Sequence, residues 1–106
     1  MVAMPPIENL AADRWILYLL ECADGTYYAG ITTNLVRRFQ QHLNGKGARY
    51  TRAHRPHCVI ASMKFSDRSA ASRAEYALKQ RKKGEKLAFF REHKAETEKR
   101  LEANAR

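Results

Sequence analysis

The sequence has only two cysteines, Cys22 and Cys58, which are too few for a disulfide framework and whose spacing matches no zinc motif. We expect both to be buried or indifferent thiols. No run of about 18 apolar residues is present, which excludes a membrane-spanning helix. Residues 1–10 also lack the basic and apolar parts of a secretory signal. These absences lead us to expect a cytoplasmic protein.

One long segment has no acidic residue. The whole chain carries 20 Lys and Arg against 11 Asp and Glu, a net charge of +9. In residues 31–64, however, every charged residue is Lys or Arg. A segment of this kind suits a phosphate-rich partner such as nucleic acid, although a merely soluble, positively charged surface is the alternative. Membrane binding is disfavoured because glycines and Pro56 interrupt the segment. Its basic residues are Arg37, Arg38, Lys46, Arg49, Arg52, Arg55 and Lys64.

A chain of 106 residues fits one domain with one hydrophobic core. Residues 1–14 contain paired prolines and no periodicity, which predicts a flexible leader. Beyond Arg91 only Leu101 is strongly apolar, so residues 92–106 are expected to form a charged helical tail. The folded domain is therefore expected over residues 15–91.

The first half of this domain predicts a hairpin and a helix. Residues 15–22 (WILYLLEC) form an apolar run typical of a buried strand, and Asp24-Gly25 is a hairpin turn signal before a returning strand over 26–31. Thr32 or Thr33 can cap a helix that runs to about Leu43, where Asn44-Gly45 ends it. The expected apolar stripe of this helix is Leu35, Val36, Phe39 and Leu43.

The second half predicts a basic loop over 45–56, a strand over 57–65 and two helices. The first of these helices opens at residues 66–69, buries Ala71, Ala74 and Leu78 and runs to Lys83, where Gly84 breaks or caps it. The second begins at Glu85. The order β-β-α-β-α-α predicts an α/β (α+β) domain in which a small mixed sheet is covered by helices.

Five side chains in this arrangement are of the types that phosphodiester hydrolysis uses. The reaction needs a base to activate water, a cation to stabilise charge on the phosphate, and usually a divalent metal. Each residue also has an ordinary interpretation, such as a core tyrosine, a surface group or an ion pair of the glutamate with Lys79. The five candidates are Tyr18, Tyr28, Arg38, His42 and Glu75.

The spacing of these residues resembles that of the GIY-YIG nuclease superfamily, and within it the small stand-alone bacterial proteins of the YhbQ-like, uncharacterised 0213 type. The resemblance covers residues 15–87. Its motifs are Trp15-x-x-Tyr18, Cys22-Ala23-Asp24-Gly25, Tyr28-Ala29-Gly30-Ile31-Thr32, Arg37-Arg38-x-x-x-His42, Gly45-Lys46-Gly47-Ala48-Arg49-Tyr50-Thr51 and Ala74-Glu75.

This resemblance implies a three-stranded, mostly antiparallel sheet flanked by helices, with one active site on its face. It implies that Tyr18 and Tyr28 handle the attacking water and that Arg38 steadies the phosphate. His42 occupies an aromatic or imidazole position, and Glu75 holds one loosely bound Mg²⁺ or Mn²⁺. The chain departs from repair-type members at Ile31, where they carry a lysine; Lys46 or Arg49 is a candidate replacement for that charge.

These observations lead to one main hypothesis and two rivals. The main hypothesis is a metal-dependent endonuclease acting on DNA rather than RNA, with branched, damaged or single-stranded DNA as candidate substrates. The first rival is a catalytically weak or inactive nucleic-acid-binding module on the same scaffold, and the second is a basic protein whose true partner is another protein. The expected phosphate contacts are Arg37, Lys46, Arg49, Arg52 and Arg55.

Strand parity adds a geometric prediction. With a two-residue loop, Tyr18 would pair with Ile31, and the two tyrosines would point to opposite sides of the sheet. With a three-residue loop in which Gly25 is left-handed, Tyr18 pairs with Gly30 and Tyr28 pairs with Leu20. Both rings then lie on one face, as a shared site requires. We therefore predict the longer, bulged hairpin, with Gly30 leaving space for water or a phosphate.

Overall fold

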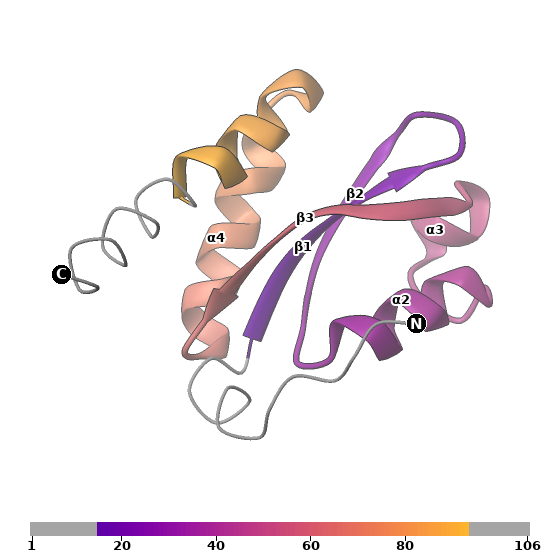
Figure 1. The fold of residues 1–106 in the computed structure, drawn as a ribbon, viewed down its shortest axis with the longest axis horizontal. Coiled ribbons are helices and arrows are strands. Elements are labelled where there is room, and N and C mark those ends of the chain that lie inside the picture. Colours follow the sequence, from indigo (N-terminus) through magenta and orange to yellow (C-terminus); the bar gives the residue numbers. More distant parts are fainter. Residues whose placement is uncertain (1–14, 94–106) are drawn as a thin grey trace, which may run out of the picture.

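The computed structural model describes residues 15–93 (Figure 1). The leader expected at 1–14 and most of the expected tail lie outside these residues. No helix in the part described is long and apolar enough to cross a membrane. The elements are β1 (Trp15–Cys22), β2 (Tyr27–Thr32), α2 (Leu35–Leu43), α3 (Arg49–Ala53), β3 (Pro56–Phe65), α4 (Arg68–Gln80) and a final helix over residues 83–93.

The sheet is antiparallel, with the order β2-β1-β3. β1 lies in the centre and pairs antiparallel with both neighbours, so the α+β class and the expected three-stranded, mostly antiparallel sheet are confirmed; the sheet is fully antiparallel rather than mixed. The reason is the connection after β2. The chain crosses the sheet through α2 and α3 and returns on the far side of β1 running against it. β2 therefore remains an edge strand.

Helices cover both faces of the sheet (Figure 1). On one face Leu17 and Leu19 pack with Leu78 of α4 and with Phe89 and Phe90 of the final helix, and these side chains form the hydrophobic core. The alternate residues of β1 point to the other face, which α2 and α3 approach. The period-two alternation of a strand thus separates an apolar core from a more polar, aromatic layer.

The first helix begins and ends through its caps. Asn34, rather than Thr32 or Thr33, is the N-cap: its side chain accepts a hydrogen bond from the Arg37 N–H at 3.1 Å. The expected cap was wrong because three polar residues follow one another, and only Asn34 reaches the third helical N–H. At the other end Gly45 is left-handed, with φ +73°, as predicted for a helix that stops at this glycine.

The expected apolar stripe of α2 is wrong at its last position. Leu43 is 42% exposed, whereas His42 is 1% exposed and is the residue that α2 buries completely. Hydrophobicity alone would place Leu43 inside. His42 replaces it because both of its ring nitrogens find partners in the interior, which removes the usual cost of burying an imidazole.

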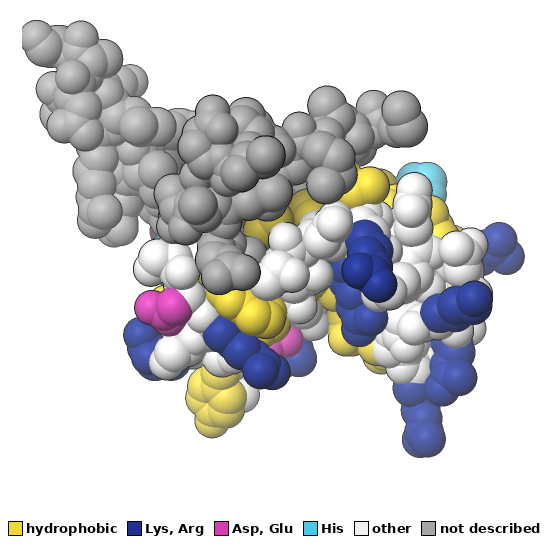
Figure 2. All heavy atoms as spheres, turned by 90° about the horizontal axis from the view of Figure 1, so that it is seen from below, with side chains coloured by type: hydrophobic (Ala, Val, Ile, Leu, Met, Phe, Trp, Pro, Cys, Tyr) yellow, Lys and Arg dark blue, Asp and Glu magenta, His cyan; other side chains and the backbone are white. Residues whose placement is uncertain are grey.

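The basic segment is not a plain loop, because α3 lies within it. The α4 helix is also shorter than expected: it ends at Gln80 because Arg81 adopts an extended backbone with ψ 149°. Gly84 therefore neither breaks nor caps α4 but lies inside the final helix. Figure 2 shows Lys and Arg side chains projecting along the flank on which Figure 1 places α2 and α3. The basic segment thus forms one side of the domain.

The hairpin has the predicted form. Gly25 is left-handed with φ +85°, the Gly25 N–H donates to the Cys22 carbonyl at 2.9 Å, and the Cys22 N–H donates to the Thr26 carbonyl at 2.8 Å. Tyr18 pairs with Gly30, and Leu20 pairs with Tyr28. The two tyrosines therefore lie on one face of the sheet, with ring centroids 6.5 Å apart.

Gly30 has a different role from the one expected. A Cβ atom at this position would lie 2.5 Å from the Tyr18 hydroxyl oxygen and 2.7 Å from the ring carbon that bears it. The ring of Tyr18 itself fills the space above Gly30, so this glycine does not leave room for water or a phosphate. Glycine is required here because the Tyr18 ring lies directly on the backbone of β2.

Replacing Gly30 by alanine should therefore destabilise the fold. We expect a loss of about 1–3 kcal/mol in the free energy of unfolding, the usual cost of overpacking a filled interior. Urea unfolding measures it. The matched control is Gly84→Ala, since nothing lies within 4 Å of that position and alanine is the better helix former by up to about 1 kcal/mol. Equal stability of the two variants would show that the Tyr18 ring moves freely.

Candidate active site

A buried chain of hydrogen bonds joins β1, α2 and α3. The Tyr18 hydroxyl lies 2.8 Å from Nε2 of His42, and Nδ1 of the same ring lies 2.7 Å from the Thr51 hydroxyl. That hydroxyl donates to the Ala48 carbonyl at 2.9 Å. Tyr18, His42 and Thr51 are each at most 2% exposed. This series of hydrogen bonds therefore fixes the position of the Tyr18 hydroxyl.

The direction of each hydrogen bond follows from the bond between Thr51 and the Ala48 carbonyl. A carbonyl only accepts, so the single hydroxyl proton of Thr51 is given to Ala48. The Thr51 oxygen must then accept from His42, which places a proton on Nδ1. In a neutral imidazole Nε2 is left with its lone pair and accepts the Tyr18 proton. The Tyr18 oxygen consequently has only acceptor capacity left for any further partner.

Burial governs the protonation of both rings. It raises the pKa of Tyr18 to about 12, with the neighbouring Arg38 opposing the rise. Burial, together with the positive charge of Arg38, lowers the pKa of His42 to about 4. At neutral pH the phenol is protonated and the imidazole is uncharged, which agrees with the pattern of hydrogen bonds.

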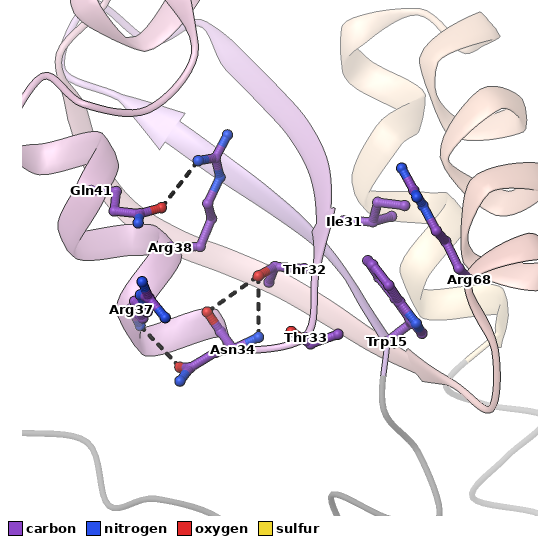
Figure 3. A pocket seen from close by; sticks show the side chains of 9 residues that line it. All are labelled: Trp15, Ile31, Thr32, Thr33, Asn34, Arg37, Arg38, Gln41 and Arg68. Atoms are coloured by element: carbon purple, nitrogen blue, oxygen red, sulfur yellow. Dashed lines mark hydrogen bonds between the residues drawn. The ribbon is translucent and has the colours of Figure 1, made fainter.

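Arg38 and Glu75 approach this chain from two helices. Arg38, on α2, donates to the Gln41 side chain at 3.1 Å (Figure 3) and influences the pKa of both Tyr18 and His42. Glu75, on α4, is among the charges that raise the pKa of Tyr18. Its carboxylate also pairs with Lys79 at 3.1 Å, so the ordinary interpretation of this glutamate, an ion pair within one helix, is confirmed as well. The structure thus gathers one cation and one carboxylate around a single phenol.

Tyr28 belongs to a series of aromatic rings that leads away from this centre. Its ring lies 5.3 Å from that of His42 and is stacked at 5.7 Å on Tyr50 of α3. Tyr50 is stacked in turn on His54 at 4.2 Å. The series therefore connects the hairpin strand β2 to the basic segment through α3.

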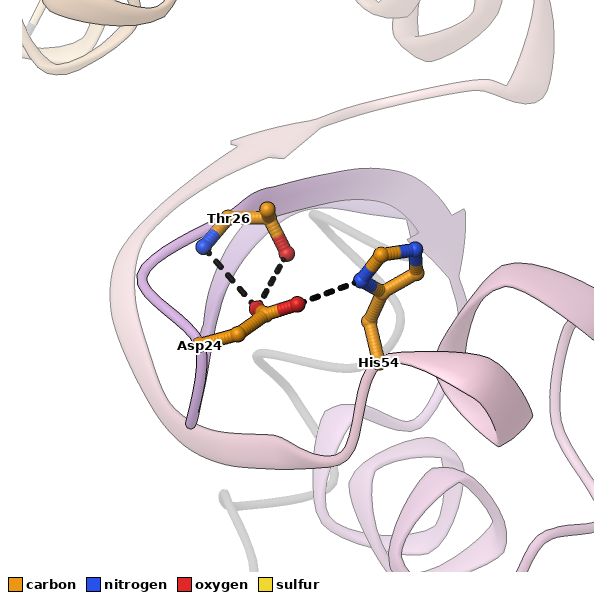
Figure 4. A network of polar contacts seen from close by, with 3 residues as sticks. All are labelled: Asp24, Thr26 and His54. Carbon is orange, nitrogen blue, oxygen red and sulfur yellow. Dashed lines mark hydrogen bonds and ion pairs between the residues drawn. The ribbon is translucent and has the colours of Figure 1, made fainter.

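The hairpin turn holds the far end of this series. Nδ1 of His54 lies 2.6 Å from one carboxylate oxygen of Asp24, and the other oxygen accepts from the Thr26 N–H and hydroxyl (Figure 4). These hydrogen bonds, first that of the Thr26 hydroxyl and then that of His54, hold the pKa of Asp24 well below its usual range. The turn and the end of α3 are thereby fixed to each other.

The expected phosphate contacts lie outside the buried chain. Their side chains are exposed: one is on α2 and the others are in or beside α3. Exposed basic side chains of this kind are typical of surfaces that attract phosphate through charge. These residues are Arg37, Lys46, Arg49, Arg52 and Arg55.

The residues present suit a loosely held divalent cation but not a tightly held one. Within residues 15–93 no group of three His, Cys, Asp or Glu side chains could enclose a metal ion. Glu75 offers a single carboxylate that is only partly exposed. Mg²⁺ commonly binds through one or two carboxylates and completes its shell with waters and substrate phosphate oxygens. Glu75 fits that mode.

Two residues that shape the candidate site were missed by the sequence interpretation. Thr51 fixes the tautomer of His42, and a Cβ at Gly47 would collide with Nδ1 of the same ring. Both stand in the stretch Gly45–Thr51, whose match to the family motifs was the available signal. Spacing alone could not show that this stretch folds over His42.

Known proteins resemble this chain over most of its length. The family model of the GIY-YIG catalytic domain matches residues 14–88. A UPF0213 protein of Xanthomonas campestris pv. campestris is 58% identical over 80 residues, which span 76% of this chain and 78% of that protein. A UPF0213 protein of Cupriavidus pinatubonensis is 49% identical over 76 residues, 72% of this chain and 84% of that protein. The solution NMR structure of an E. faecalis protein is 38% identical with a TM-score of 0.55, covering 76% and 85% of the two chains.

The low pKa of His42 predicts a pH-dependent stability. Between pH 6.5, the ordinary imidazole value, and about 4, the unfolded chain binds a proton that the folded chain does not. The stability is therefore complete above that window and declines as the pH falls through it. We expect a decline of about 3 kcal/mol from this group, measured by urea unfolding between pH 7.5 and 4.

The control is His42→Gln, which retains the ion pair between Asp24 and His54 and every other titrating group. The variant should be less stable at neutral pH but should show a shallower pH dependence than the parent chain. Parallel curves for the two proteins would mean that His42 is not buried in its neutral form.

Proposed function

The chain belongs to the GIY-YIG family of nucleases, and on that premise we propose that it is a metal-dependent endonuclease that hydrolyses phosphodiester bonds in DNA. The observation that carries this proposal is the hydrogen bond between the Tyr18 hydroxyl and Nε2 of His42. The Tyr18 proton is directed to His42, so the Tyr18 oxygen can accept a proton from a water molecule beside it. Arg38, which acts on the same hydroxyl, is placed to hold the phosphate that this water attacks.

The same chain of hydrogen bonds supplies a path for the proton. As water attacks phosphorus, the Tyr18 oxygen accepts the water proton while its own proton passes to Nε2 of His42. The P–O ester bond breaks with its electron pair on the leaving sugar oxygen, which takes a proton from solvent. In the free protein the low pKa of His42, caused first by burial and then by the charge on Arg38, opposes this transfer. A phosphate bound at Arg38 offsets that charge and raises the basicity of His42. Substrate binding thereby prepares the base.

Glu75 would hold the Mg²⁺ or Mn²⁺ ion, which, when bound, supplies Lewis-acid stabilisation of the phosphate charge. The carboxylate must exchange its ion pair with Lys79 for this role. That pair also favours a second candidate, a nucleic-acid-binding module with little or no turnover, in which Glu75 remains with Lys79. A protein partner is the third candidate, and neutralising the basic segment distinguishes it from DNA.

Two substitutions separate the endonuclease from the binding module. Arg38→Ala should lower Mg²⁺-dependent cleavage by roughly 10²–10³-fold, the usual loss when one preorganised charge is removed. Glu75→Gln should abolish metal-dependent cleavage and leave DNA affinity nearly unchanged. The measurement is cleavage of branched, nicked and single-stranded DNA and RNA in Mg²⁺ or Mn²⁺.

Arg73→Ala is a suitable control, because this exposed arginine lies on α4 and donates to Ser69. Cleavage by either Arg38→Ala or Glu75→Gln at the parent rate would show that the activity comes from another site or from a contaminant. Tight DNA binding without cleavage under any of these conditions would support the binding module.

The basic segment should supply much of the affinity for DNA. Neutralising three of its side chains together (Lys46, Arg49 and Arg52, each to Gln) should weaken binding and reduce the slope of log affinity against log salt by about two to three. A matched triple on the opposite side of the domain (Arg73, Lys82 and Arg91, each to Gln) changes the net charge equally and should have a smaller effect. Equal affinity and slope in the two triples would favour a protein partner over DNA.

A further inference from the structure

A pocket of about 390 Å³ lies where the ends of α2 and α4 approach the edge strand β2 (Figure 3). Arg37, Arg38 and Gln41 line it from α2, and Trp15 and Arg68 line it from the opposite side. Residues 31–34, at the end of β2 and in the turn that follows, lie between these two walls. This volume lies within the range of small-ligand sites.

The charge of the pocket is of one sign. Three arginines line it, and no carboxylate does. Within residues 15–93 none of the three takes part in an ion pair. Guanidinium groups that share a cavity repel one another and gain most from an oxyanion that accepts several N–H bonds at once. The pocket is therefore built for an anion with several oxygens.

Arg68 lies against the ring of Trp15. Its guanidinium carbon lies 5.5 Å from the centroid of the Trp15 ring, within the distance of a cation–π contact. This contact reduces the side-chain entropy that binding a ligand would otherwise remove. Arg68 is the first residue of α4, whose N-cap Asp67 accepts a hydrogen bond from the Ala70 N–H through its side chain. Arg68 was in neither the motifs nor the acid-free segment, whereas Trp15 was known as the first residue of a motif.

Arg38 connects this pocket to the buried phenol, since it lines the pocket and also acts on Tyr18. We propose that the pocket binds a backbone phosphate of the nucleic acid next to the phosphate that is cleaved, with Arg68 as its main contact and Arg37 as a second. This inference rests on the proposed function. The bound strand would then pass from the basic segment at one end of α2, across Arg38, to Arg68 at the other end.

The pocket carries its own reporter, because Trp15 is the single tryptophan of the chain. Titration of the full chain with thymidine 3′,5′-bisphosphate should change the Trp15 emission saturably, against sodium chloride at equal ionic strength. Arg68→Gln should weaken this binding roughly tenfold, the loss of one charge-assisted contact. The matched control Arg73→Gln removes an exposed charge from the same helix and should titrate as the parent chain does.

The second readout is binding of DNA itself. Arg68→Gln should reduce the slope of log affinity against log salt by about one, and Arg73→Gln should reduce it by less. The proposed phosphate site would be overturned if the Trp15 emission of the parent chain did not change on titration. It would also be overturned if Arg68→Gln and Arg73→Gln bound the bisphosphate with equal affinity.

The two proposals fail separately. If DNA is bound and cut while Arg68→Gln behaves as Arg73→Gln, the pocket is wrong and the endonuclease stands. If the bisphosphate binds through Arg68 while no nucleic acid is bound or cut, the phosphate site is real and the endonuclease is wrong.

Discussion

The rest of the site depends on the burial of one uncharged histidine. His42 contacts β1 through Tyr18 and α3 through Thr51, so three elements meet at a single imidazole ring. The arrangement is stable only because both ring nitrogens are satisfied; a buried polar atom without a partner costs about 1–3 kcal/mol. Gly47 lies against the same ring, which allows the basic segment to close over it. The geometry of the candidate base and the course of the basic segment are therefore consequences of the same contact.

This arrangement explains how a small domain can separate its hydrophobic core from its reactive groups. Side chains that alternate along β1 send Leu17 and Leu19 to the core and Tyr18 to the opposite layer. A hairpin loop shorter by one residue would send Tyr18 and Tyr28 to different faces. Gly25, with its positive φ, sustains the longer loop, and Asp24 ties that loop to His54. The turn therefore controls which face carries the chemistry.

Charge is arranged around the site so that the centre is neutral and its surroundings are positive. Tyr18 and His42 are uncharged at neutral pH, whereas exposed arginines lie toward both ends of α2. An uncharged centre is cheap to bury, while charges at the surface keep their hydration and remain free to bind phosphate. In the proposed mechanism these two properties meet at Arg38, which belongs to both regions.

The sequence by itself determined the three strands, the turn glycine of the hairpin, the end of α2 at Gly45 and the start of α4 within residues 66–69; the register of the hairpin followed once both tyrosines were required on one face. These features depend on local patterns: alternation, a turn glycine and capping side chains. Through motif spacing it also predicted Tyr18 and the four residues that the structure gathers around its phenol. Only the tertiary structure decided that His42 rather than Leu43 is buried, that α3 forms within the basic segment, and that Arg68 joins Arg38 in one pocket. Each of these depends on partners distant in sequence. α3 is five residues long and has no side-chain cap, so its contact with His42, rather than helix propensity, accounts for its place in the fold.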